Sequence, residues 1–299
     1  MTPLATIVRG FGIEPDAIRL LRRRYNTHWA VRAGERRYVL RRFGTWKGAE
    51  DDPAWEVAWV RRLAEAGFPA PAPVAEPRMV DGAMHMLMPR LPGRPLGAAH
   101  VDDARYRQLG RHLADVHAAI EGLPLPVQRP RWSQAVDGAL PIDGGRARRA
   151  ELLAALTAVD PALGEQLTVA TAALDARDLP GVFAGAPRIV AHCDFSPWNV
   201  RLSGGRLVGL IDFELAHVDV RAADLAAARR GYHDAVVDGY LERASLPDAH
   251  VAALDGLWLG GILAGLWRVL ESRLAEGSDL AYGMGWDVEQ LAKTRPYRG

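Results

Sequence analysis

Three polar residues, each placed beside a short apolar run, constrain the fold of this chain more than any other feature. Asp194 follows the apolar run 188–191, Asn199 comes five residues later, and Asp212 follows a second apolar run. Short apolar runs bounded by turn residues are typical of strands. The turn Ser203-Gly204-Gly205, which lies between Asn199 and Asp212, predicts a hairpin. We therefore expect a strand, a loop and a hairpin that bring Asn199 and Asp212 to the same end of one sheet.

These three side chains match the chemical requirements of phosphoryl transfer. The reaction needs a carboxylate that orients and deprotonates the acceptor hydroxyl, and oxygen ligands that hold Mg²⁺ on the nucleotide phosphates. We predict Asp194 as the catalytic carboxylate, and Asn199 and Asp212 as the metal ligands. A single Asp in a loop is more often a turn or cap residue, but the three residues together favour the catalytic interpretation.

The order of these residues along the chain carries a family resemblance. The pattern His192-x-Asp194-x-x-x-x-Asn199, followed by Asp212-Phe213, resembles the catalytic and metal loops of the kinase-like phosphotransferases. More narrowly, it resembles the aminoglycoside phosphotransferase/choline kinase family. The resemblance spans nearly the whole chain from residue 18 to about 230. It is strong at 188–225 and only generic thereafter.

The resemblance implies an α+β fold of the bilobal, protein-kinase-like type. A small β-rich lobe over residues 1–91 is expected to bind the nucleotide. A larger, mainly helical lobe over residues 92–299 is expected to carry catalysis and the acceptor site. The nucleotide would lie in the cleft between the lobes, where ligand sites commonly occur.

Hydrophobic periodicity fits this division. The early part of the chain contains alternating runs that predict strands and one amphipathic helix, whereas the part after residue 102 is mostly helical in pattern. We expect strands at 18–25, 28–33 and 37–41, a helix at 53–66, a hairpin at 80–88, and helices at 103–121, 146–176 and 222–292.

Two further residues near the catalytic segment have structural roles in the family that the chain resembles. The resemblance implies that His192 braces the catalytic loop, and that Asp224 caps a helix and ties it back to that loop. Cys193 departs from the family pattern, because its position is commonly Gly. A bulky thiol reagent that reached Cys193 would be expected to slow turnover.

The resemblance also assigns residues that contact the nucleotide phosphates. Arg41 takes the place of the phosphate-binding Lys at the end of a strand, and Glu56 matches the helix Glu that pairs with that cation. The interpretation without a nucleotide is that Glu56 is an exposed helix residue with a partner one turn away. In the glycine-free loop between the first strands, Asn26 and His28 are candidate phosphate donors, although turn formation is the more common use of Asn.

The connector after the hairpin suggests how a nucleotide base is held. By resemblance, Met88 lines the back of the base pocket. The carbonyl of Pro89 accepts from the exocyclic amine, and the amide of Leu91 donates to a ring nitrogen. Pro89 lacks an N–H, but only its carbonyl is required.

The acceptor site is the least specified part of the sequence. Glu214, Asp219 and Glu271 are the acids that we select as candidates for binding a cationic acceptor. Glu214 also takes the place of the Gly in the Asp-Phe-Gly of protein kinases. Together with the absence of a G-x-G-x-x-G loop, this disfavours a protein substrate.

We therefore predict an enzyme, an ATP- or GTP-dependent O-phosphotransferase that uses Mg²⁺ and phosphorylates a hydroxyl of a small molecule. An antibiotic such as an aminoglycoside is one class of acceptor, in resistance or in biosynthesis. The alternatives are a metabolite kinase for homoserine, choline or a sugar, and a catalytically silent kinase-like nucleotide-binding protein. The intact set of Asp194, Asn199 and Asp212 speaks against the silent protein.

Composition narrows the partners. The 299-residue chain has a net charge of +1, so neither nucleic acid nor a membrane is an expected partner. One cysteine and the lack of a signal-like start predict a cytoplasmic protein. The longest apolar run, 256–267, is too short to cross a bilayer. The oligomeric state stays open.

Overall fold

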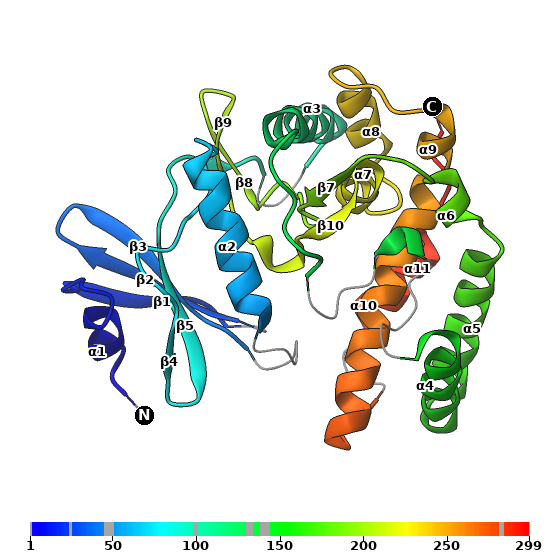
Figure 1. Cartoon of the computed structure of the whole chain (residues 1–299), viewed down its shortest axis with the longest axis horizontal. Coiled ribbons are helices and arrows are strands. Elements are labelled where there is room, and N and C mark those ends of the chain that lie inside the picture. The colour runs from blue at the N-terminus through cyan, green and yellow to red at the C-terminus, as the bar shows by residue number, and fades with distance from the viewer. Residues whose placement is uncertain are drawn as a thin grey trace. The chain divides into compact units, whose positions relative to one another are not determined.

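The computed structural model describes residues 2–23, 26–44, 51–97, 101–129, 134–137, 144–280 and 284–298. The chain packs into two units (Figure 1). The N-terminal unit comprises Met1–Pro95 together with Val200–Ile211, and the C-terminal unit comprises Leu96–Asn199 together with Asp212–Gly299. The first boundary between the units, after Pro95, thus lies four residues beyond the predicted division at 91/92. The hairpin after Asn199 returns to the N-terminal unit, which the sequence did not predict.

A five-stranded antiparallel sheet dominates the N-terminal unit. Its strand order is β1-β2-β3-β5-β4. Leu40 in the third strand lies opposite Trp29 on one side and Leu87 on the other, so the apolar positions of neighbouring strands are in register. The strands are β1 Ala17–Arg23, β2 Thr27–Ala33, β3 Arg36–Arg42, β4 Arg78–Val80 and β5 Ala83–Pro89.

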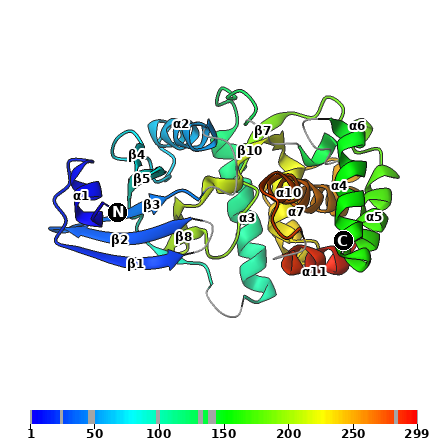
Figure 2. The same cartoon turned by 90° about the horizontal axis from the view of Figure 1, so that it is seen from below.

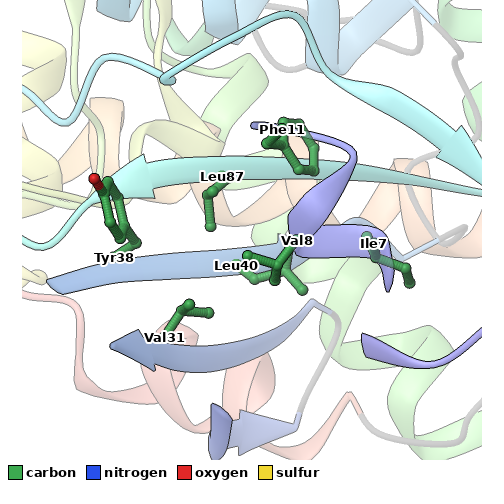
Figure 3. Packing of buried hydrophobic residues seen from close by; sticks show 7 residues of the cluster. All are labelled: Ile7, Val8, Phe11, Val31, Tyr38, Leu40 and Leu87. Atoms are coloured by element: carbon green, nitrogen blue, oxygen red, sulfur yellow. The ribbon is translucent and has the colours of Figure 1, made fainter. Parts of the chain in front are cut away.

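One face of this sheet carries the core of the N-terminal unit. The helix α1, Leu4–Arg9, which the sequence did not predict, packs on that face. Figure 3 shows its side chains together with those of the strands beneath it. The buried cluster consists of Ile7, Val8, Phe11, Val31, Tyr38, Leu40 and Leu87.

The opposite face of the sheet presents polar and large apolar side chains. Successive side chains of a strand alternate between faces, so Arg41 lies on the face opposite Leu40. The helix α2, Asp51–Glu65, supplies Glu56 as the partner of Arg41 and buries Trp55 and Trp59. This is the helix that the sequence predicts at 53–66.

The predicted hairpin after the catalytic loop is confirmed. The strands β8, Val200–Ser203, and β9, Arg206–Leu210, pair antiparallel, and β6, Arg94–Pro95, adds a third strand beside β8. Gly204 and Gly205 form the turn with φ of 56° and 76°, values that favour glycine. The amide of Leu210 donates to the carbonyl of Pro69 at 3.0 Å.

The C-terminal unit is mainly helical around one short antiparallel pair of strands. The strand β7, Arg188–Ala191, pairs with β10, His217–Val220. The helices α4 and α5 lie side by side in both views (Figure 1, Figure 2). The remaining elements are α3 Asp103–Ile120, α4 Gly145–Val159, α5 Pro161–Asp175, α6 Leu179–Val182, α7 Arg221–Arg229, α8 Asp234–Leu241, α9 Asp248–Ala252, α10 Leu254–Glu276 and α11 Gly285–Lys293, with short 3-10 turns η1 Ala135–Asp137 and η2 Phe213–Leu215.

Side-chain caps explain where two of these helices begin. The carboxylate of Asp102 accepts from the amide of Arg105 at 2.9 Å at the start of α3. Asp160 accepts from the amide of Leu163 at the start of α5, where Pro161 takes the first helical position.

Two glycines allow α3 and α8 to approach closely. A Cβ on Gly110 would lie 1.9 Å from the carbonyl oxygen of Val236, and a Cβ on Gly239 would lie 1.9 Å from that of Arg107. Any side chain at either position would separate the helices. This close packing sets the position of the C-terminal half of α3, which contributes to the site described below.

The fold is the predicted α+β class, with an antiparallel sheet in the N-terminal region and a mostly helical remainder. In the ranges described, no helix combines the length and the apolar character needed to cross a bilayer. The apolar run 256–267 forms the buried first half of α10.

Candidate active site

The loop after β7 holds Asp194 between two donors. The Nδ2 of Asn199 donates to Oδ2 of Asp194 at 2.8 Å and to its backbone carbonyl at 2.9 Å. The Nη2 of Arg230 donates to Oδ1 of Asp194 at 3.0 Å. The structure therefore brings Asp194 and Asn199 into direct contact, as the motif predicts. It also adds Arg230, which the sequence did not single out.

The surroundings of the Asp194 carboxyl group shift its pKa. Burial raises this pKa above its usual range, and the nearby charge of Asp212 raises it further. The charges of Arg230 and His192 and the hydrogen bond from Asn199 act in the opposite direction. Since the charge of Asp212 acts on Asp194, the two carboxylates lie close enough to repel each other.

This donor set fits a hard divalent cation. Two repelling carboxylates attract a cation, and Mg²⁺ takes oxygen ligands from one or two protein groups, with the rest from phosphate and water. The amide nitrogen of Asn199 faces Asp194, so its oxygen is the atom suited to a metal. Among the described residues, no cluster of three or more His, Cys, Asp and Glu side chains forms a metal site.

Asp212 stands in a strained backbone conformation that a buried arginine supports. Its φ of 69° and ψ of 63° lie in the left-handed region, where a non-glycine residue costs about 1–2 kcal/mol. The turn η2 follows directly. The Nη1 of Arg129 donates to the carbonyls of Phe213, Glu214 and Ala216 at 3.2, 2.8 and 2.8 Å. Arg129 lies in a segment without periodicity, and no sequence signal pointed to it.

Asp224 joins the catalytic loop to three helices. Its carboxylate accepts from the amides of His192 at 2.8 Å and Cys193 at 2.9 Å, which is the tie that the resemblance implies. The predicted helix cap is wrong, because Asp224 lies inside α7, whose N-cap is Val220. It also lies 3.1 Å from Nε2 of His117 on α3, and Nδ1 of His117 lies 2.9 Å from the hydroxyl of Tyr240 on α8. Burial opposes ionisation of Asp224, but the hydrogen bonds and charges of His117 and His192 outweigh it and lower its pKa.

His192 and Cys193 have structural positions in the loop. The Nδ1 of His192 accepts from the amide of Asp194 at 3.2 Å, and its ring packs edge-on against Phe213. This geometry fits the bracing role. Cys193 has a φ of 56°, which explains why glycine suits this position. Burial raises the pKa of its thiol well above the usual range.

The N-terminal unit forms the ion pair that the resemblance implies. The Nη1 of Arg41 lies 2.6 Å from Oε1 of Glu56, and the two side chains are only 3% and 4% exposed. The guanidinium of Arg41 also lies 4.4 Å from the centre of the Phe43 ring. Glu56 is therefore not the exposed helix residue of the alternative interpretation.

The other residues predicted to bind the nucleotide have defined places in the same unit. Asn26 is buried, and its side-chain oxygen accepts from the amide of Gly44 at 2.9 Å, so it braces the backbone at the end of β3. His28 lies in β2 directly opposite Arg41. Met88 and Pro89 end β5, and the side chain of Leu91 packs on the backbone of Gly209. Arg24 and Tyr25, at the end of the strand predicted at 18–25, are outside the described residues.

Comparison with known proteins decides the family. Residues 17–257 match the model of the phosphotransferase enzyme family, which covers most of the chain. The chain belongs to this family. It is a small-molecule kinase, and the predicted family, fold class and type of enzyme are confirmed.

Individual relatives of the kinase differ in their names. It is 30% identical over 311 residues to an uncharacterised protein of Deinococcus radiodurans, with 88% of this chain and 82% of the relative covered. It is also 30% identical to the homoserine kinase of Rhizobium johnstonii, with 68% of this chain covered. The kinase spans 64% of the length of that relative. A crystal structure of aminoglycoside phosphotransferase APH(4)-Ia with ADP and hygromycin B superimposes with a TM-score of 0.63, 17% identity and coverage of 96% and 95% of the two chains. At this identity the last comparison shows the fold alone.

The three acids predicted for the acceptor site of the kinase differ in their exposure to solvent. Asp219 is fully buried (0% exposed), accepts from the amides of Ala135 and Val220, and pairs with Arg188 at 3.4 Å. A carboxylate in this position has no access to an acceptor, so we correct the prediction and assign Asp219 a structural role.

The other two acids are partly exposed. Glu214 lies in η2, immediately after the strained Asp212 and Phe213. Glu271 lies in α10, where its Oε1 is 3.6 Å from Nε of Arg148. Both stay candidates for the acceptor site, and the contact with Arg148 already neutralises part of the charge of Glu271.

Proposed function

We propose that this kinase transfers the terminal phosphoryl group of ATP or GTP to a hydroxyl of a small molecule, with Mg²⁺ as the cofactor. The observation that carries the proposal is the setting of Asp194. Its carboxylate is held by Asn199 on one oxygen and by Arg230 on the other, and the charge of Asp212 reaches it. Such a set serves phosphoryl transfer, which depends mainly on positioning and on charge neutralisation.

We assign each residue of the site a role in this reaction. Asp194 orients the acceptor hydroxyl and takes its proton as the hydroxyl oxygen bonds to the terminal phosphorus. The bond from that phosphorus to the bridging oxygen breaks, which leaves a phosphate ester and a nucleoside diphosphate. Asn199 and Asp212 would hold Mg²⁺, which supplies neutralisation of the phosphate charge when it is bound.

The N-terminal residues complete the proposal on the nucleotide side. Arg41, positioned by Glu56, would bind phosphate oxygens, with His28 opposite it in the sheet as a further donor. Asn26 would act through the backbone that it braces. Met88, Pro89 and Leu91 would contact the base. Residues 1–91 thus provide the nucleotide side, and residues 92–299 provide catalysis and the acceptor side.

A homoserine-type metabolite kinase is the second candidate for the exact activity. Several relatives named homoserine kinase are 28–34% identical to this chain, including the one from Rhizobium johnstonii. The antibiotic kinases among the solved structures are similar to this chain in fold alone, although several of them are complexes of a nucleotide with an antibiotic. Sequence relatives therefore favour a metabolite over an antibiotic as the acceptor.

The test is transfer of labelled terminal phosphate from ATP or GTP to a panel of acceptors. The panel contains homoserine, choline, sugars, aminoglycosides and other hydroxylated antibiotics, each with and without Mg²⁺. Asp194→Asn should lower turnover about 10²–10⁴-fold while nucleotide binding persists. Asp115→Asn, at a partly exposed acid on α3, is the matched control. Near-normal turnover of Asp194→Asn, or no transfer to any acceptor, would contradict the proposal.

A further inference from the structure

Arg230 holds a specific position beside Asp194. It follows α7 and adopts the left-handed conformation, with φ of 53° and ψ of 34°. Its Nη2 donates to Oδ1 of Asp194 at 3.0 Å, and its Cζ lies 4.6 Å from the centre of the Trp198 ring. The side chain of Arg230 is 18% exposed, and Trp198 is 44% exposed despite its size. A guanidinium stacked on an accessible indole therefore flanks the catalytic carboxylate.

The two oxygens of Asp194 face different groups. Oδ2 faces Asn199, the proposed metal ligand, whereas Oδ1 faces Arg230. The proposed metal and phosphates would lie beside Asn199, on the Oδ2 side of the Asp194 carboxylate. Arg230 lies on the Oδ1 side. That side is where an acceptor hydroxyl would approach.

The segment that carries Arg230 is fixed by a second set of contacts. Arg229 is fully buried and pairs with Asp234 at 2.7 Å, and Arg295 pairs with the other oxygen of Asp234 at 2.7 Å. The Nη2 of Arg229 also donates to the carbonyl of Pro296 at 3.1 Å. Asp234, the acid closest in sequence to Arg230, is thus already bound by two arginines. The segment 294–297 contacts the residues beside Arg230 and fixes the backbone there.

His233, three residues after Arg230, is uncharged. Burial, together with the charge of Arg230, lowers the pKa of His233 to about 4, so this ring is neutral at pH 7. Of the three acids predicted to bind a cationic acceptor, Asp219 is buried and Glu271 lies against Arg148, which leaves Glu214 after Asp212 and Phe213.

We propose that Arg230, backed by Trp198, binds a carboxylate of the acceptor, so that the kinase selects small hydroxy acids and hydroxyl-bearing amino acids. The inference rests on the proposed function and names its acceptor class. A guanidinium has five N–H donors in a planar fork that matches the two oxygens of a carboxylate, and the hydrogen bond to Asp194 uses one of them. Stacking on Trp198 engages the face of the guanidinium and leaves its edges to hydrogen-bond.

The experiment compares acceptors that differ only by a carboxylate. The pairs are L-homoserine with 3-aminopropan-1-ol, L-serine with ethanolamine, and glycerate with ethylene glycol. For each pair we measure kcat and KM for phosphoryl transfer with Mg²⁺ and the preferred nucleotide. A charged hydrogen-bonded contact predicts that at least one carboxylate member has a kcat/KM about 10–100-fold above that of its partner.

Variants at Arg230 then assign the selectivity. Arg230→Gln should bring the ratio of the two kcat/KM values close to 1, mainly by raising KM for the carboxylate member. Arg230→Lys, which keeps the charge but not the fork, should retain part of the ratio. Thermal unfolding confirms that both variants are folded. Arg146→Gln, at an exposed arginine on α4, is the matched control and should leave the ratio unchanged.

The outcomes separate this inference from the proposed function. Equal loss of kcat/KM for both members of a pair in Arg230→Gln would show that Arg230 acts on Asp194 or on phosphate alone, and would overturn the inference. Transfer to aminoglycosides or other cationic acceptors, with none to the carboxylate members, would also overturn it and leave the proposed function standing. No transfer to any acceptor would overturn both.

Discussion

The Nε2 of His117 lies 3.1 Å from Oδ2 of Asp224, and both side chains are buried. The carboxylate of Asp224 also receives the amides of His192 and Cys193, so α3 and the catalytic loop share one acceptor. On its other nitrogen, His117 meets the hydroxyl of Tyr240, whose pKa burial raises to about 12. Tyr240 therefore keeps its proton and can donate to Nδ1, while Nε2–H donates to Asp224.

Replacing His117 should weaken both the fold and catalysis. His117→Leu leaves the buried carboxylate of Asp224 without its imidazole partner, which predicts a loss of about 2–4 kcal/mol in the free energy of unfolding. Urea unfolding measures this loss, and kcat should fall more than nucleotide affinity. His112→Leu on the same helix is the control, because burial lowers the pKa of His112 and its neutral ring is replaced at small cost. Equal stability of the two variants would contradict the bracing role.

The pH dependence of turnover should reflect the raised pKa of Asp194. The proposed base, Asp194, must be ionised to accept a proton, so we expect activity to fall as the pH drops through its pKa. Because burial raises this pKa, the acid limb of the kcat/KM profile should lie above the usual Asp value of 3.8. Arg230 lowers the same pKa, so Arg230→Gln should move the limb to still higher pH. A limb that does not move, with Arg146→Gln as the reference, would separate Arg230 from the titration of Asp194.

Removing one carboxylate should abolish the metal-dependent part of nucleotide binding. Asp212→Asn keeps the size of the side chain but removes the charge that attracts Mg²⁺. Calorimetric titration of a non-hydrolysable ATP analogue, with and without Mg²⁺, measures the effect. Asp248→Asn, at an exposed acid in the first turn of α9, is the control. Tight, Mg²⁺-dependent binding by Asp212→Asn would remove Asp212 from the metal site.

Breaking the buried ion pair of the N-terminal unit should cost stability as well as nucleotide affinity. Glu56→Gln leaves the guanidinium of Arg41 buried without its counter-charge, and breaking a buried pair in this way costs about 3–5 kcal/mol. Denaturant unfolding and KM for the nucleotide measure the two effects. Glu65→Gln, on the exposed side of α2, should change neither. An unchanged KM together with lower stability would limit the pair to a structural role.

Local sequence patterns predicted the structures and contacts that involve residues close together in the sequence. The hairpin after Asn199 follows from its turn residues, and the contact of Asn199 with Asp194 joins residues five positions apart. The pairing of Arg41 with Glu56 came from the family resemblance. In each case the information lies within one segment or one known motif.

Contacts between distant segments were beyond sequence reasoning. His117 and Asp224 are 107 positions apart, and Arg129 reaches carbonyls more than 80 positions away. Asp219 was misjudged because its strand, β10, is buried on both faces, and a four-residue run that contains an acid does not reveal this. Arg230 was missed because one arginine beside another at a helix end has no pattern of its own.

The two proposed metal ligands lie at the two ends of the segment that the chain inserts into the N-terminal unit. The backbone leaves the C-terminal unit after Asn199 and re-enters it at Asp212. A cation held by both side chains would therefore clamp the base of the hairpin β8–β9, fastening its outgoing strand to its returning strand.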